Sequence, residues 1–140
     1  MFRKVLLVNS GTLDADGAWE AALALASRFH AELHMVVVEE LPRFPISISE
    51  VDHERKALRQ RTTYIVSSAS TRAAEASVAF EAHIVVGGLI PGVLSTATAN
   101  QCDLLIVGAK GRANLSDLIY GRPSEQLSRA VACPVLMINR

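Results

Sequence analysis

Several features that define common protein classes are scarce or missing in this chain of 140 residues. It has only two cysteines, Cys102 and Cys133, which is too few for a disulfide framework and favours two reduced thiols in a cytosolic protein. Its 14 lysines and arginines balance 14 aspartates and glutamates, so no net charge attracts the chain to nucleic acid or to an anionic membrane. The first apolar run, Val5–Val8, is too short for a signal sequence or a membrane span, and we therefore expect a cytoplasmic protein.

The motifs of several enzyme and metal-binding classes are also absent. There is no Gly-x-x-x-x-Gly-Lys-Ser/Thr loop, no Gly-x-Gly-x-x-Gly fingerprint and no Gly-x-Ser-x-Gly elbow. There is no Cys-x-x-Cys, and no pair of the four histidines is expected to ligate zinc. No residue pair resembles a general base beside a nucleophile, so we expect neither a catalytic residue nor a metal site.

What the chain does contain is a regular alternation of apolar and amphipathic segments. Strands are expected over 5–8, 33–38, 79–86, 103–107 and 134–138, and helices over 17–29, 49–76, 92–100 and 123–131. Asp14 or Asp16 is expected to cap the first helix and Ser49 the long second one. Apolar strands that alternate with helices predict a parallel sheet covered on both faces. We therefore expect a single three-layer α/β/α domain over residues 1–140 with a five-stranded sheet.

The most informative loop lies after the fourth expected strand. Sheets of this kind bind ligands beyond the carboxyl ends of their strands, where the strand order reverses. If the first and fourth strands are neighbours, the loops 9–12 and 108–122 border one cleft. The second loop and the helix start behind it supply glycines, cations and a hydroxyl: Gly108, Lys110, Gly111, Arg112, Gly121, Arg122 and Ser124. Glycines and a helix N-terminus favour an anion such as a phosphate, although strand-ending glycines and a simple helix cap are the alternative.

At this loop the sequence resembles the universal stress protein family. Gly108, Gly111 and Gly121 match the family's nucleotide-binding pattern Gly-x2-Gly-x9-Gly, which continues with Ser or Thr. The segments Lys4–Val8, Asp103–Gly108 and Cys133–Ile138 resemble the family's first, fourth and closing strands. The resemblance implies the adenine-nucleotide alpha-hydrolase-like fold, with a parallel sheet in the order 3-2-1-4-5.

The resemblance also implies a nucleotide site. Carried over by position, the contacts fall on Ser10, Val38, Val107, Gly108, Gly111, Gly121, Arg122 and Ser124. Two of these depart from the family pattern, because Ser10 stands where binders have Asp and Arg122 stands where Ser or Thr is expected. Ser10 has a weaker acceptor than a carboxylate, and Arg122 either clamps a phosphate or fills its pocket.

The function implied by this resemblance is a stress response regulated by ATP or AMP, with Mg²⁺ accompanying ATP. The alternative is a dimeric interaction protein of the same fold with a degenerate site, and slow ATP hydrolysis is the weakest candidate. A homodimer is expected through the last strand, Pro134–Ile138, because pairing with its copy would protect an apolar edge. We expect no nucleic-acid partner and no membrane span.

Two charged segments have less specific interpretations. Glu39 and Glu40 follow the second strand and could hold a metal with a nucleotide, but a solvated loop is the preferred interpretation. The basic stretch Arg55, Lys56, Arg59 and Arg61 is interpreted as the solvated face of an amphipathic helix rather than a partner surface. Cys133 is interpreted as a packed thiol rather than a nucleophile.

Overall fold

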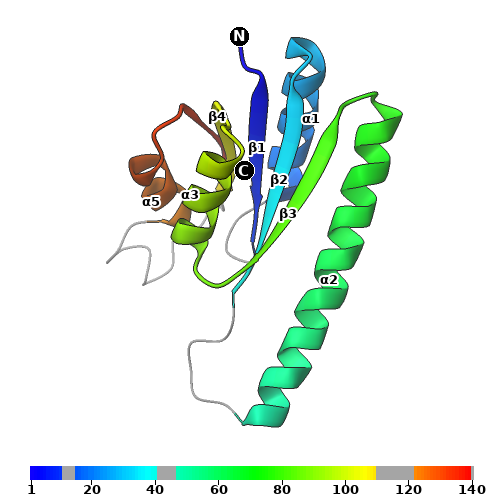
Figure 1. Ribbon diagram of the computed structural model, residues 1–140, viewed down its shortest axis with the longest axis vertical. Coiled ribbons are helices and arrows are strands. Elements are labelled where there is room, and N and C mark those ends of the chain that lie inside the picture. Colours follow the sequence, from blue (N-terminus) through cyan, green and yellow to red (C-terminus); the bar gives the residue numbers. More distant parts are fainter. Residues whose placement is uncertain (11–14, 41–46, 110–121, 140) are drawn as a thin grey trace.

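A parallel five-stranded sheet forms the centre of the molecule (Figure 1), as seen in a computed structural model that describes residues 1–10, 15–40, 47–109 and 122–139. The strands are β1 (Lys4–Asn9), β2 (Glu32–Glu39), β3 (Phe80–Val86), β4 (Leu104–Ala109) and β5 (Val135–Asn139). The helices are α1 (Ala15–Phe29), α2 (Ile48–Glu75), α3 (Leu89–Ala99) and α5 (Pro123–Ala130). The strand order is β3-β2-β1-β4-β5, which confirms the predicted fold class and the predicted adjacency of the first and fourth strands.

The strands are apolar along their whole length because both faces of the sheet are covered. One core layer joins alternate strand residues such as Val5, Leu33 and Ile106 to Trp19 of α1 and Ala73 of α2. The intervening residues face the other side and pack with α3 and α5. This second layer comprises Leu6, Val8, Val36, Val38, Leu89, Val93, Leu105, Val107 and Leu127. Alternation within each strand therefore produces two cores, one on each face of the sheet.

The long helix α2 begins at a different serine from the one that the sequence favoured. Ser47 is the N-cap, with extended backbone angles, and its hydroxyl accepts a hydrogen bond from the backbone N–H of Glu50 at 3.2 Å. Ser49 lies inside the helix, so its prediction as the cap is wrong. Asp16 likewise lies inside α1 rather than before it, and Asp14 lies outside the described residues. Short polar side chains cluster before a helix, and only the local backbone decides which one caps it.

Replacing Ser47 with Ala should lower the free energy of unfolding by about 1 kcal/mol, because it removes the acceptor for the Glu50 N–H. Ser49→Ala is the matched control: the exposed Ser49 hydroxyl contacts the Ser47 hydroxyl at 3.2 Å, but it is Ser47 that accepts from the backbone of the first turn. Equilibrium urea denaturation of both variants measures the difference. If Ser49→Ala lowers the free energy of unfolding more than Ser47→Ala does, Ser49 and not Ser47 caps the helix.

The two edges of the sheet are formed by β3 and β5. On β3, Ile84 and Val86 are 44% and 53% exposed. On β5, Leu136 and Met137 are 37% and 40% exposed, although residues of this kind are fully buried on the central strands. Within the part of the chain that the structure describes, no helix combines the length and apolarity needed to cross a membrane.

Candidate functional site

The carboxyl ends of β1 and β4 lie side by side in the middle of the sheet. The two strands pair in parallel, with Leu7 beside Ile106, so the residues that follow them emerge at the same carboxyl-terminal edge of the sheet, which is distinct from the edge strands β3 and β5. Ser10 comes directly after β1 and is only 4% exposed. Val107 and Gly108 near the end of β4 are also buried. The strand order therefore reverses between β1 and β4, and a buried hydroxyl and a glycine lie at this point. Open α/β sheets bind ligands at the point where the strand order reverses.

The second strand meets the same edge beside β1. Asn9 pairs with Val37, so Ser10 and Val38 are the next residues along the two strands. The side chain of Val38 is 4% exposed and belongs to the core layer beneath α3 and α5. A ligand at the carboxyl end of β2 can therefore reach only the backbone of Val38, and a backbone contact tolerates any side chain at this position.

The start of α5 is the third segment at this edge. Arg122 is the N-cap residue, Pro123 opens the helix and Ser124 is 2% exposed. The backbone N–H of Arg122 lies 3.4 Å from a carboxylate oxygen of Glu125. Glu125 therefore directs a negative charge at the helix start, where the sequence led us to expect free N–H groups. The spacing of Glu125 three residues after the cap is the signal that could have revealed it.

The rest of the predicted glycine loop cannot be placed. Gly111 and Gly121 lie outside the described residues, as do the cations Lys110 and Arg112. Their roles in binding stay predictions from the spacing of the glycines.

Glu39 differs from its predicted surroundings. It is the last residue of β2, not part of a solvated loop, and it is 5% exposed. The Thr62 hydroxyl donates to one of its carboxylate oxygens at 2.5 Å, and Arg59 forms an ion pair with the other at 3.1 Å. The interpretation of Glu39 as a solvated loop residue is therefore wrong, because α2 folds over the end of β2 and supplies two donors to this carboxylate.

The same contacts border a groove at the carboxyl ends of β2 and β3. Its volume is about 340 Å³, and its walls are formed by Glu39, Arg55, Lys56, Leu58, Arg59 and Val86. The side chains of the basic stretch are exposed, as expected. Three of them, Arg55, Lys56 and Arg59, also line this groove. One feature of the sequence could have indicated this groove: a run of cationic residues lies in the helix that follows the strand ending in Glu39.

Two histidines that are distant in the sequence meet on neighbouring strands. The rings of His34 on β2 and His83 on β3 have centroids 5.2 Å apart and an angle of 8° between their planes, and a hydrogen bond joins their nitrogens. Burial lowers the pKa of His83 from its usual value, Glu81 opposes this effect, and His34 adds to it. The net lowering leaves His83 neutral at pH 7.

Both cysteines are half-buried and pack against the second core layer. Burial raises the pKa of Cys102 to about 11, and it also raises the pKa of Cys133. Their thiols are therefore protonated at neutral pH, and a protonated thiol is a poor nucleophile. This agrees with the interpretation of Cys133 as a packing residue.

Comparison with known proteins gives a consistent assignment. The model of the universal stress protein family matches residues 1–139. The universal stress protein YxiE of Bacillus subtilis is 27% identical over 148 aligned positions, which cover 99% of this chain and 100% of that protein.

Solved structures of the same fold include two with a bound nucleotide. A universal stress protein in complex with cAMP has a TM-score of 0.74 and 22% identity, with 98% of this chain and 97% of that chain covered. A universal stress protein family protein from Arabidopsis thaliana with AMP bound has a TM-score of 0.66 and 19% identity, with 99% and 92% covered. The sheet order, the glycine spacing and the family match agree: this chain belongs to the universal stress protein family.

Proposed function

We propose that this protein binds an adenine nucleotide, ATP or AMP, as a regulatory ligand in a cytoplasmic stress response. The observation that carries the proposal is the meeting of three segments at one edge of the sheet. Ser10 after β1, Gly108 in β4 and Ser124 in α5 are all buried where the strand order reverses. Such an edge suits a ligand that needs hydroxyl contacts and a close approach of the backbone.

Structural relatives support the nucleotide class. Two universal stress proteins of the same fold were solved with cAMP and with AMP, and both ligands consist of adenosine and one phosphate. In our proposal Ser10 hydrogen-bonds the ribose, the backbone at Val38 reads the adenine, and Val107 and Gly108 border the sugar. These roles follow the family pattern at the matching positions.

The phosphates are assigned mainly to the glycine loop. Glu125 places a carboxylate at the start of α5, and Pro123 has no N–H to donate, so this helix start offers few donors to a phosphate. We therefore assign the phosphates to Gly111, Gly121 and the Ser124 hydroxyl, with Arg122 as a clamp. Mg²⁺ would accompany ATP. In this proposal the protein acts by binding and not by catalysis.

Isothermal titration with ATP, AMP and cAMP tests the proposal, with thermal unfolding as a second measurement. A ligand held at this site raises the unfolding temperature, and the rise grows with the logarithm of the free ligand concentration once that concentration exceeds Kd. We expect ATP or AMP to bind with one site per chain. If no adenine nucleotide binds at millimolar concentration and none raises the unfolding temperature, the protein is instead an interaction module with a degenerate site.

We also propose a homodimer that pairs the β5 edges of two copies. Leu136 and Met137 point to opposite faces of this edge strand, and both are more than a third exposed. Pairing across a two-fold axis would cover these apolar side chains and satisfy the free side of the strand.

Met137→Lys should weaken such a dimer by at least tenfold, because symmetry places the new charge in the interface twice. Val135 is a poorer position to change, since it packs against the second core layer. Ile84→Lys on the opposite edge strand is the matched control, because Ile84 is exposed to a similar extent. Light scattering at micromolar concentration reads the mass. A monomeric wild type, or a dimer disrupted by Ile84→Lys alone, would contradict pairing through β5.

A further inference from the structure

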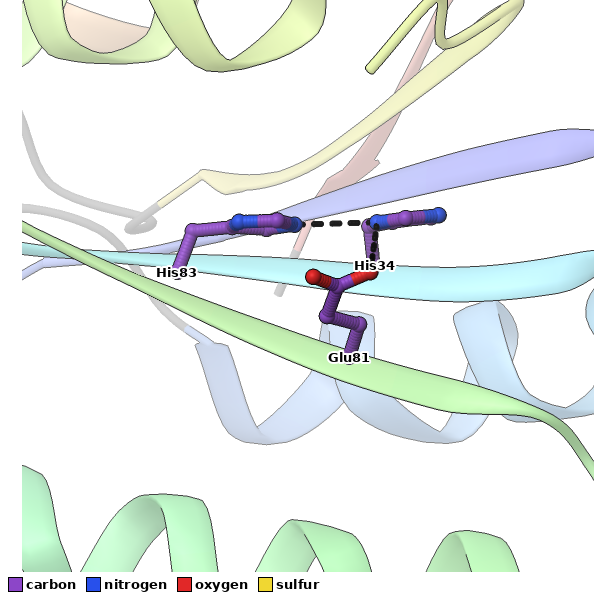
Figure 2. A group of neighbouring side chains, drawn as sticks. All are labelled: His34, Glu81 and His83. Carbon is purple, nitrogen blue, oxygen red and sulfur yellow. Dashed lines mark hydrogen bonds and ion pairs between the residues drawn. The ribbon is translucent and has the colours of Figure 1, made fainter. Parts of the chain in front are cut away.

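The histidine pair on β2 and β3 has the arrangement of metal ligands. Figure 2 shows the two imidazole rings edge to edge in nearly the same plane. A hydrogen bond of 2.9 Å joins His34 Nδ1 and His83 Nε2, so one of these two nitrogens carries the proton between them. His34 is 4% exposed and is held in place by the sheet and the core around it. The pair comes from neighbouring strands in fixed register, so the two rings lie close together before any ligand binds.

Glu81 supplies a third donor atom at the same point. In the parallel ladder Glu81 pairs with His34, and His83 pairs with Val36, so all three side chains leave the sheet on one face. A carboxylate oxygen of Glu81 lies 3.9 Å from His34 Nδ1. One ligand atom from each residue, two nitrogens and one oxygen, falls within a group whose members are no more than 4.8 Å apart.

A fourth residue fixes the orientation of His34. A carboxylate oxygen of Glu32 lies 3.3 Å from His34 Nε2. If Nε2 carries the proton and donates it to Glu32, Nδ1 keeps its lone pair and directs it toward His83 and Glu81. Imidazoles that bind metals usually have such a carboxylate partner on their second nitrogen.

We propose that His34 Nδ1, His83 Nε2 and the Glu81 carboxylate bind one divalent transition-metal ion of the zinc class, with water in the remaining position. Two nitrogens on a tetrahedral Zn²⁺ at about 2.0–2.1 Å stand roughly 3.3–3.4 Å apart. The ion would therefore take the place of the hydrogen bond between the rings, and both rings would have to separate and tilt until their lone pairs point at it. Glu32 is the positioning residue.

The chemistry of these ligands sets the class of ion. Imidazole nitrogens suit Zn²⁺, Cu²⁺ and Ni²⁺, whereas Mg²⁺ and Ca²⁺ prefer sites made of oxygen alone. The carboxylates of Glu81 and Glu32 are 64% and 54% exposed, and they provide a negatively charged path from solvent to the buried ring. None of its ligands is among the residues proposed to bind the nucleotide, so the proposal does not depend on that function.

Zinc titration of the untagged protein tests this proposal, by calorimetry or by competition with a chromophoric chelator. We expect one Zn²⁺ per chain. His83→Ala should weaken its binding by at least tenfold, and Glu81→Gln and Glu32→Gln should each weaken it by about tenfold or more. His53→Ala is the matched control, because His53 is an exposed histidine on α2. Zinc affinity that is unchanged in His83→Ala, or absent from the wild type at millimolar zinc, overturns the site.

A second measurement separates this site from binding by the cysteines. The Cu²⁺-loaded protein should show electron paramagnetic resonance couplings from two imidazole nitrogens, and His83→Ala should lose one of them. Cys102→Ser should leave both couplings and the zinc affinity as they are. If Cys102→Ser abolishes binding while His83→Ala does not, the thiols hold the metal and the proposal is wrong. Circular dichroism of each variant establishes that it folds.

Discussion

Replacing Gly111 with Val is expected to abolish nucleotide binding while the ligand-free protein keeps its fold. Gly111 is the middle member of the Gly108, Gly111, Gly121 spacing on which the proposed phosphate site depends. A phosphate in such a loop is held by backbone N–H groups, which it can approach only where no side chain intervenes. A β-branched side chain adds bulk at that point and also restricts the backbone. We expect a loss of at least about 100-fold in affinity, which corresponds to about 2.7 kcal/mol.

Titration calorimetry with ATP and AMP measures this loss. Ala99→Val adds two methyl groups at an exposed position of α3, and α3 ends at the opposite edge of the sheet. This control should bind nucleotide like the wild type. If Gly111→Val binds with unchanged affinity, the site is not built on this loop. If both variants lose binding, the effect is a general one on the fold.

The fold could be predicted because its signals are local and repeated. Runs such as Val5–Val8 and Leu104–Val107 are apolar at consecutive positions, and this is the pattern of a strand with both faces covered. The helices between them follow from the same alternation, and the strand order came with the family resemblance. Exact ends were less predictable, as Ser47 and Ser49 illustrate, because two similar side chains compete for one cap.

The nucleotide site expected beyond β1 and β4 was predictable from topology, because Ser10 and Gly108 lie near the carboxyl ends of these two neighbouring strands. The polar contacts that span elements were not. His34 and His83 are 49 positions apart, and only the register of β2 against β3 brings their nitrogens together. The expectation that no histidine pair would ligate zinc rested on spacing along the chain. Such spacing detects ligands that share a helix or a loop, and it cannot reveal two histidines on different strands. Glu39 was misjudged for a related reason, since its donors come from the middle of α2.

The buried carboxylate of Glu39 gives the second large expected effect. Thr62→Val should lower the free energy of unfolding by about 1.5–3 kcal/mol, because it removes a hydrogen bond to a charged group. Thr62 is 2% exposed and Glu39 5%, so little water is available to replace the lost donor. Valine has nearly the same shape as threonine, so packing contributes little to the loss. Arg59 remains paired with the carboxylate, but its own side chain is 58% exposed, which limits how far it can compensate.

Two companion variants separate the hydrogen bond from other effects. Thr62→Ser keeps the hydroxyl and loses one methyl group, so it should cost about 1 kcal/mol or less. Thr63→Val, one residue further along α2, should change stability by less than about 0.5 kcal/mol, because Thr63 is exposed and its hydroxyl bonds only to the Arg59 carbonyl of its own helix. Urea denaturation of the three variants gives the ranking. Equal stability of Thr62→Val and Thr63→Val would contradict this prediction. It would mean that the hydrogen bond from Thr62 does not stabilise the Glu39 carboxylate at the end of β2.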